Sequence, residues 1–396
     1  MSVRIQTAQV DVTPEAAGYR QEVLDRIDGL LTGLINENKL QCASYLFARE
    51  GQVFASKAIG ALRHTEDSPD YMPDSIRRIA SVTKWFTLVC IMRLVEEGKL
   101  TLIQPVKDWI PEFDKSSYAK VTIHHLITHT SGIIPDGGYF TEPYPLGWYD
   151  MLFAFEDGEE DLAALTDAEK LARSKSQWIK AMLSGPPVCE PGAQWNYSSA
   201  GFSILGEIME RASGMRFDEY IRTTIIEPLG MTRTFFEVPE HLEDEVCVTN
   251  DWDVRGLKRR IADNPAAPPR TGGGLYSTLQ DLNIFGQMML TGSYNGKRIL
   301  SRKSIELIKR DQFPKGVPAY NWGGDIKKFH FGLSSSLSFP VDFFAPSAYM
   351  HEGAGRCALM VDPVEQLVVV FFVPSIVDWV PESMLNLKNM IWSGLQ

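Results

Sequence analysis

Ser81 and Lys84 are two residues whose types and spacing suit nucleophilic chemistry. They lie three positions apart in the stretch IASVTKWFTLVCIMRLVEEGKL. Apolar residues recur behind them at steps of three and four and end before Gly98, which predicts a helix closed by a glycine cap. Unpaired backbone N–H groups at such a helix start favour negative charge on an oxygen. We therefore expect Lys84 to share a hydrogen bond with the Ser81 hydroxyl on one face of the helix.

The spacing alone does not establish a catalytic pair. A serine at a helix start is more commonly a plain N-cap, and the same spacing recurs in SYAK, at Ser117 and Lys120. After Ser117 the sequence restarts with a strand-like Val121 and a capping Thr122 in place of a long apolar helix. We interpret Ser117 as a loop residue and retain Ser81 as the candidate nucleophile.

Two further stretches carry polar residues at positions where a ligand can approach. EPGAQWNYSSAG places Tyr197 and Ser199 on a turn just before a helix. YMHEGAGRCALMVDP places His351 and Gly353 at the start of a strand, where glycines allow close approach to the backbone. Taken singly, each has a structural interpretation: Tyr197 as a half-buried core phenol, His351 as a structural histidine and the glycines as turn residues.

Taken together, the three stretches resemble the penicillin-recognising serine hydrolase superfamily, in its branch of class C β-lactamases, serine D-alanyl-D-alanine carboxypeptidases and β-lactamase-fold esterases. That branch carries Ser-x-x-Lys, Tyr-x-Asn and Lys-x-Gly or His-x-Gly motifs. The corresponding triplets here are Ser81-Val82-Thr83-Lys84, Tyr197-Ser198-Ser199 and His351-Glu352-Gly353. Scaffold phrases such as LVEEGKLTLIQPVKDWIPEF, VTIHHLITHTSGI and GGGLYSTLQDLNIFGQMML extend the resemblance from about residue 20 to the end of the chain.

The resemblance implies a mechanism without a cofactor or a metal. Ser81 attacks a carbonyl and forms an acyl-enzyme, while Lys84 and Tyr197 share the transfer of its proton to the leaving group. The reference pKa of both lysine and tyrosine is about 10, so each needs its surroundings to make it a base at neutral pH. The backbone N–H groups of Ser81 and Ala354 are expected to form the oxyanion hole.

The resemblance also assigns substrate binding to Ser199, His351, Glu352 and Gly353, and two of these depart from the usual pattern. Ser199 stands where asparagine is usual, which removes an amide that would bind an acylamide group. Glu352 stands where a small hydroxyl residue is common and is expected to repel a substrate carboxylate, unless His351 or Arg356 offsets its charge. Both departures favour a neutral ester over a β-lactam or a D-peptide.

The elements expected at the two ends of the chain suggest how the motifs are positioned. An amphipathic helix over residues 19–38 precedes a hairpin over 43–60. Near the other end, two strands flank Asp362 and Pro363, and PESMLNLKNMIWSGL closes the chain as a helix. We therefore predict an antiparallel sheet built from both termini and faced by the terminal helices.

These elements predict an α/β (α+β) fold of the β-lactamase/transpeptidase-like type. Residues 1–80 and 270–396 are expected to form the sheet domain. Residues 81–269 are expected to form a mostly helical inserted subdomain that carries the first two motifs. Within it, the aromatic, Pro-rich and then acidic segment 138–190 is a possible lid, although its charge run is more commonly a solvated face.

Composition restricts the classes of function. The chain has 396 residues, 44% of them hydrophobic, and a formal charge of −11 without a pronounced basic cluster, which argues against nucleic acid as a partner. Its amino terminus lacks an apolar signal region, and its longest apolar run, LVVVFFV, is too short to span a bilayer, so we expect a soluble, cytoplasmic protein. Five scattered cysteines predict free thiols.

Several functions stay open on the sequence alone. A metal site at His124, His125 and His129 is disfavoured because HHLITH lacks the glutamate of H-E-x-x-H. A catalytically inactive binding or assembly protein on the same fold is a second alternative. Among enzymes with a small-molecule substrate, the missing export signal favours an esterase, amidase or D-amino-acid peptidase over a true β-lactamase or a cell-wall carboxypeptidase. The sequence does not determine the oligomeric state.

Overall fold

The computed structural model describes residues 3–114, 117–133, 135–136, 165–313, 315–321, 324–338, 342–377 and 380–396. Most of the predicted lid, up to residue 164, lies outside the described residues. Its remaining part contains the helix α5 (Asp167–Met182).

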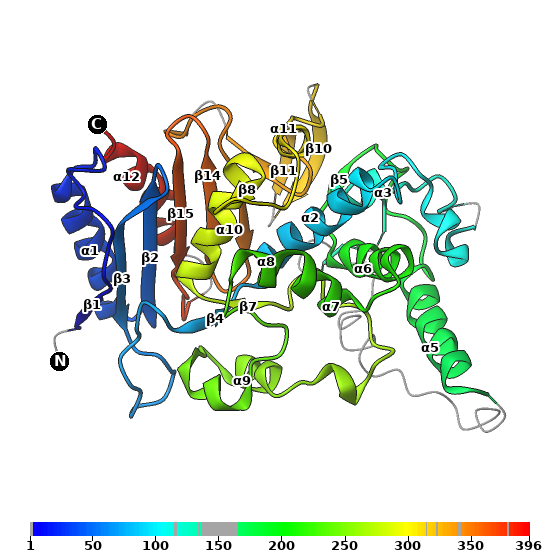
Figure 1. The fold of residues 1–396 in the computed structure, drawn as a ribbon, viewed down its shortest axis with the longest axis horizontal. Helices are drawn as coiled ribbons and strands as arrows, with labels where there is room; N and C mark the ends of the chain where they lie inside the picture. The colour runs from blue at the N-terminus through cyan, green and yellow to red at the C-terminus, as the bar shows by residue number, and fades with distance from the viewer. Residues whose placement is uncertain are drawn as a thin grey trace.

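A seven-stranded antiparallel sheet is assembled from the two ends of the chain, as the sequence predicts (Figure 1). Its strands in spatial order are β1 (Ile5–Thr7), β3 (Gln52–Gly60), β2 (Cys42–Arg49), β15 (Leu367–Phe372), β14 (Cys357–Asp362), β13 (Tyr349–Gly353) and β12 (Ser336–Leu337). The centre is β15, a fully buried Leu-Val-Val-Val-Phe-Phe run whose β-branched and aromatic side chains suit a strand covered on both faces.

Helices cover both faces of this sheet (Figure 1). On one face, α1 (Gln21–Asn36) and α12 (Leu387–Ser393) pack over Val369 and Phe371 of β15. On the other, α10 (Leu279–Thr291) packs over Val368 and Val370. Because side chains alternate along β15, successive residues of this strand pack into two separate hydrophobic cores.

The helical part of the molecule lies beside the α10 face and is centred on α2 (Thr83–Glu96). The first three turns of α2 are buried throughout, so this helix is a core element of the whole domain. It packs against α6 (Ser199–Ser213), which begins directly after the second motif and ends at Gly214. The other helices here are α3 (Ile123–Ile127), α7 (Phe217–Ile221), α8 (Glu227–Leu229) and α9 (Asp251–Leu257), and α11 (Arg302–Ile308) follows α10.

Short sheets connect the helical part to the large sheet. Their strands are β4 (Ile76–Arg78), β6 (Val246–Cys247) and β7 (Tyr276–Ser277) in one sheet, β5 (Trp195–Asn196), β10 (Val317–Asn321) and β11 (Gly324–Phe329) in another, and the pair β8 (Ser293–Tyr294) and β9 (Lys297–Arg298). Strand β4 ends just before the first motif and β5 just before the second. These short strands therefore position both motifs.

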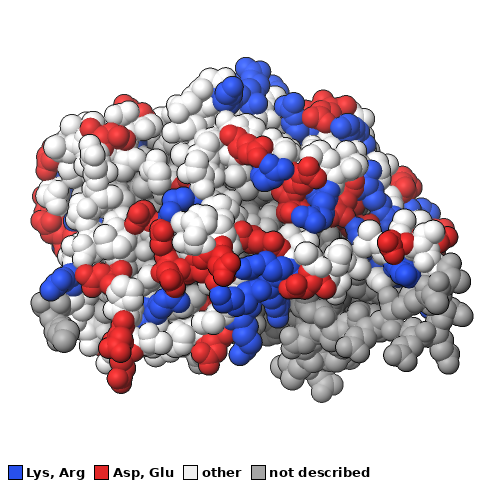
Figure 2. Space-filling model, turned by 60° about the horizontal axis from the view of Figure 1, so that its bottom comes forward, with Lys and Arg blue, Asp and Glu red and all other residues white. Residues whose placement is uncertain are grey.

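The surface and the cysteines agree with the composition. Acidic and basic side chains are interspersed over the face shown in Figure 2. All five cysteines are free thiols, as predicted. No helix in the described part of the chain is long and apolar enough to cross a membrane.

Candidate active site

Ser81 lies in a tight turn that leads into the central helix. The turn is a 3₁₀ helix, Ala80–Val82, and α2 continues from it at Thr83. The N-cap position of α2 is Val82, so Ser81 is not the plain cap that its sequence position allowed. Ala80 has φ of +43°, a left-handed conformation that is costly for a residue with a side chain and is typical of functional sites. The turn fixes the Ser81 backbone at the start of α2.

Lys84 connects three segments through its ammonium group. Its Nζ donates to Ser81 Oγ at 3.2 Å, to Ser199 Oγ at 3.0 Å and to the Gly272 carbonyl oxygen at 2.6 Å. Burial lowers the pKa of Lys84 to about 8, although the nearby Asp136 carboxylate raises it. About a tenth of Lys84 is therefore the neutral amine at pH 7, the form that a general base requires.

Tyr197 packs its ring against the same ammonium group. Lys84 Nζ lies 4.6 Å from the centre of the Tyr197 ring, within the range of a cation–π contact. The Tyr197 ring also packs against the His129 ring, with 4.4 Å between ring centres. The structure thus brings Tyr197, Lys84 and Ser81 together, and proton transfer by the Tyr197 hydroxyl stays a prediction.

The third motif packs against the turn that carries the first motif, and the contact is made at Gly353. A Cβ atom at Gly353 would lie 2.4 Å from the Ile79 carbonyl oxygen and 3.2 Å from the Ala80 Cβ. Only glycine therefore allows β13 to approach the turn that carries Ser81. Ala354 follows at an exposed turn, and the contribution of its N–H to an oxyanion hole stays a prediction.

His351 faces the same side of β13 as Gly353. Its ring packs edge-on against Trp85 of α2, with 6.4 Å between ring centres. Burial, assisted by the positive charge of Lys84, lowers the pKa of His351 to about 3. His351 is therefore neutral at physiological pH and supplies no charge to bind a substrate carboxylate or to offset Glu352.

The structure places the Glu352 side chain away from Ser81, and the repulsion of a substrate carboxylate expected from the sequence stays untested. Side chains alternate along a strand, so Glu352 points to the face of β13 opposite that of His351 and Gly353. There it forms an ion pair with Lys388 of α12. Glu352 instead connects the sheet to the C-terminal helix.

Asp136 is a site residue that the sequence analysis missed. It is half-buried, and its two carboxylate oxygens accept hydrogen bonds from the Ser199 backbone N–H at 2.6 Å and from the Ser199 hydroxyl at 2.7 Å. Its own N–H donates to the Tyr197 carbonyl oxygen at 3.0 Å. A single aspartate after a proline carries no periodic signal, and only the tertiary contact with the second motif identifies it.

The three histidines proposed as a metal alternative have separate partners. His125 completes the capping box of α3 with Thr122, and His124 bonds to Gln312. His129 lies beyond the end of α3, and its Nδ1 accepts the Ser198 N–H at 3.1 Å. His125 and His129 therefore do not lie on one helix, and His129 instead supports the second motif.

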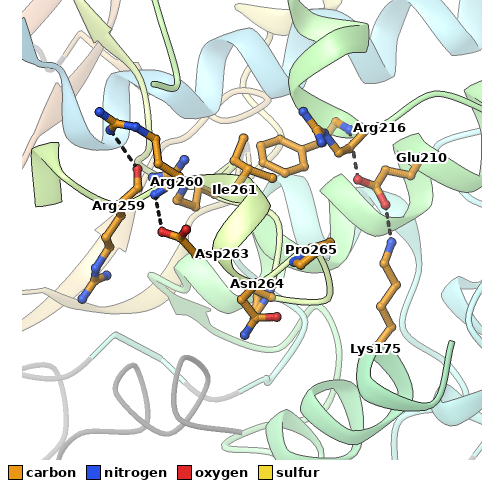
Figure 3. A pocket seen from close by; sticks show the side chains of 13 residues that line it. Lys175, Glu210, Arg216, Arg259, Arg260, Ile261, Asp263, Asn264 and Pro265 are labelled. Carbon is orange, nitrogen blue, oxygen red and sulfur yellow. Dashed lines mark hydrogen bonds and ion pairs between the residues drawn. The ribbon is translucent and has the colours of Figure 1, made fainter. Parts of the chain in front are cut away.

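A separate cavity of about 280 Å³ contains none of the predicted site residues (Figure 3). Phe217 and Ile261 are among the apolar groups that line it. Several of its charged residues form ion pairs: Lys175 with Glu207 and Glu210, Arg216 with Asp218, Arg260 with Glu243, and Arg270 with Glu237 at 3.7 Å. These cations are already paired with carboxylates and are not available to bind an anionic ligand. The cavity is therefore a weaker candidate for the functional site than the surroundings of Ser81.

Comparisons with known proteins agree with this geometry. The family model described as Beta-lactamase matches residues 27–375. Esterase EstB of Burkholderia gladioli is 32% identical over 281 residues, which cover 65% of this chain and 67% of the esterase.

Two solved structures show the same fold. A family VIII carboxylesterase is 17% identical, with a TM-score of 0.70 and coverage of 99% of this chain and 100% of its own. A class C beta-lactamase is 16% identical, with a TM-score of 0.69 and coverage of 95% and 97%. These two likenesses concern the fold alone.

Proposed function

Because the chain belongs to the β-lactamase family, we propose that it is a serine hydrolase that works through an acyl-enzyme on Ser81. The observation that carries this proposal is the 3.2 Å contact between Lys84 Nζ and Ser81 Oγ, made by a lysine whose pKa is lowered to about 8. A nucleophile and a base within hydrogen-bond reach are the defining arrangement of covalent catalysis by serine.

In the proposed reaction, neutral Lys84 accepts the Ser81 proton as Ser81 Oγ attacks the substrate carbonyl carbon. The carbonyl oxygen becomes an oxyanion, which the N–H groups of Ser81 and Ala354 stabilise by about 3 kcal/mol each. Collapse of the intermediate breaks the bond to the leaving group, which receives a proton by way of Lys84 and Tyr197. Water then attacks the acyl-enzyme, releases the acid and returns the proton to Ser81.

We propose a neutral ester as the preferred substrate, with an amide or a D-amino-acid peptide as the next candidates. Ser199 lacks the amide that would bind an acylamide group, and its hydroxyl is already hydrogen-bonded to Asp136 and Lys84. The similarity to a protein named as an esterase points the same way. A true β-lactamase or D-alanyl-D-alanine carboxypeptidase is the alternative enzyme, and an inactive binding protein is the alternative of a different class.

Active-site labelling tests the mechanism. We expect a fluorophosphonate to modify Ser81, located by peptide mass spectrometry. We expect Ser81→Ala to lose both labelling and turnover while staying folded, because the Ser81 hydroxyl does not cap α2. Ser117→Ala is the matched control, because Ser117 has the same spacing to a lysine but lies exposed in a turn. Undiminished turnover by Ser81→Ala would remove Ser81 as the nucleophile.

A substrate panel tests the specificity. We expect a short p-nitrophenyl ester to have a higher kcat/KM than nitrocefin or a D-alanyl p-nitroanilide. A preference for nitrocefin would make the β-lactamase alternative the better assignment, and a protein that neither labels nor turns over any of the three would be a binding protein.

A further inference from the structure

We propose that Asp136 is a positioning residue that acts through the Ser199 hydroxyl to direct the lone pair of Lys84 at Ser81. The inference rests on the proposed function, because it concerns the base of that reaction. It is carried by a continuous chain of hydrogen bonds that joins the Asp136 carboxylate to Ser199, Ser199 to Lys84 and Lys84 to Ser81.

The first step concerns the direction of the Ser199 hydroxyl. The backbone N–H of Ser199 donates to one oxygen of Asp136, which fixes the carboxylate in place. The other oxygen lies 2.7 Å from Ser199 Oγ, and an ionised carboxylate can only accept. The Ser199 hydrogen is therefore directed to Asp136, so Ser199 Oγ can only accept from Lys84.

The second step counts the hydrogens on Lys84. As an ammonium, it has three N–H donors for the Gly272 carbonyl, Ser199 Oγ and Ser81 Oγ. As a neutral amine it keeps two hydrogens and gains a lone pair. The Gly272 carbonyl and Ser199 Oγ both accept, so they take the two hydrogens. The lone pair is left facing Ser81 Oγ, which is the orientation that proton abstraction requires.

The groups around Lys84 come from several elements. Two are histidines, His129 and His351, and the pKa of each is lowered, chiefly by burial and further by the charge of Lys84, so both are neutral. The Tyr197 ring lies 4.6 Å away. The fourth is the Asp136 carboxylate, which raises the pKa of Lys84. Asp136 thus sets both the orientation and the charge balance of the amine.

Asp136→Asn separates this role from simple packing. The asparagine oxygen can still accept the Ser199 backbone N–H, but its NH₂ group then faces Ser199 Oγ and donates to it. The Ser199 hydrogen must turn elsewhere and competes with Ser81 for the Lys84 lone pair. We expect kcat for a p-nitrophenyl ester to fall by about tenfold or more. We also expect the acid limb of the kcat/KM–pH profile to move to lower pH, because the charge that raises the pKa of Lys84 is gone.

Asp281→Asn is the matched control. Asp281 is a buried aspartate that, like Asp136, accepts from a backbone N–H, that of Arg233 at 2.8 Å, and from a hydroxyl, that of Thr234 at 2.8 Å. Its partners belong to a different part of the fold. We expect the melting temperature of Asp281→Asn to change by about as much as that of Asp136→Asn. The acid limb of its kcat/KM–pH profile should stay at the wild-type position. An equal shift of the limb in both variants would overturn the proposal.

Ser199→Ala tests the relay, by which we mean the chain of hydrogen bonds from Asp136 through Ser199 to Lys84. The variant leaves Asp136 unchanged and keeps the hydrogen bond from the backbone N–H of residue 199 to Asp136, so its result does not depend on whether Asp136→Asn folds. Its kcat should fall, and combining it with Asp136→Asn should reduce kcat by less than the product of the single effects, because both changes break one relay. Additive losses, or full activity in Ser199→Ala, would contradict the relay. Such a result would leave the labelling of Ser81 intact, so the relay and the proposed function fail separately.

Discussion

At the scale of single residues, the site depends on one buried amine. Lys84 is fully buried, yet each of its three N–H donors has an acceptor: Ser81, Ser199 or the Gly272 carbonyl. Desolvation disfavours its charged form, while the Asp136 carboxylate limits that effect. The balance brings the pKa of Lys84 to about 8, where a base can work at physiological pH.

This pKa predicts the pH dependence of the reaction. The active form is neutral Lys84, so kcat/KM for a neutral ester should rise with pH through a midpoint near 8. Initial rates between pH 5 and 10 with a substrate that does not itself titrate measure this limb. Lys84→Arg should lose activity at every pH in that range, because a guanidinium is not deprotonated there. An active Lys84→Arg variant with the wild-type limb would show that another group is the base.

The position of Glu352 predicts that its charge does not govern specificity. Glu352→Gln should leave the ratio of ester to nitrocefin turnover unchanged, because the carboxylate pairs with Lys388 on the far face of β13. The Glu352 side chain is 42% exposed, so solvent screening limits the stability lost to about 1 kcal/mol, measurable by urea unfolding. A large gain in nitrocefin turnover would restore the sequence-based view of this residue.

At the scale of elements, the site is where a strand meets a turn. The strand β13 approaches the turn Ala80–Val82 at Gly353, and the Cys357 thiol donates to the Ile79 carbonyl oxygen at 3.1 Å in the same contact. The large sheet and the central helix α2 therefore share one tightly packed junction. The conformation of the Ser81 backbone depends on that junction.

Gly353→Ala tests the junction. Its Cβ would meet the Ile79 oxygen at 2.4 Å and the Cys357 sulfur at 2.5 Å, so β13 must move away from Ser81. We expect kcat/KM to fall more than tenfold, consistent with the sensitivity of catalysis to small displacements. The control is Gly33→Ala in α1, where an added Cβ meets nothing within 4 Å in the described part of the chain. That variant should keep full activity and gain up to about 1 kcal/mol of stability. Equal activity of the two variants would show that the close approach is unnecessary.

At the scale of the whole molecule, the part of the sheet that carries the third motif depends on the last residues of the chain. The helix α12 packs beside α1 over one face of the sheet (Figure 1). Its Trp392 is buried, donates from Nε1 to Asp362 at 2.8 Å and packs against Phe344. The helix α12 therefore stabilises β14, which pairs with the strand β13 that carries the third motif.

Trp392→Ala should destabilise the whole domain by about 3–5 kcal/mol, because it leaves a large cavity between α12 and the sheet. Denaturant unfolding followed by fluorescence and by loss of activity should give one coincident transition. Ile103→Ala is the control, since Ile103 is 81% exposed and its loss should be nearly neutral. Loss of activity at a much lower denaturant concentration than loss of the fluorescence signal would show that the helical part and the sheet unfold separately.

The sequence by itself determined the family, the sheet built from both termini and the pairing of Ser81 with Lys84. These features depend on local patterns, namely apolar periodicity, turn residues and short motifs, which a single segment carries in full. The choice of Ser81 over Ser117 also followed from the local sequence, because only Ser81 precedes a long apolar helix.

Only the tertiary structure decided the roles of Glu352 and Asp136. The face to which Glu352 points depends on the register of β13 against β14, which the local motif does not contain. The position of Asp136 beside Ser199 depends on contact between residues 63 positions apart. The pKa of Lys84 likewise arises from burial and one distant carboxylate. Such contacts between remote segments leave no pattern in the local sequence, because folding alone brings them together.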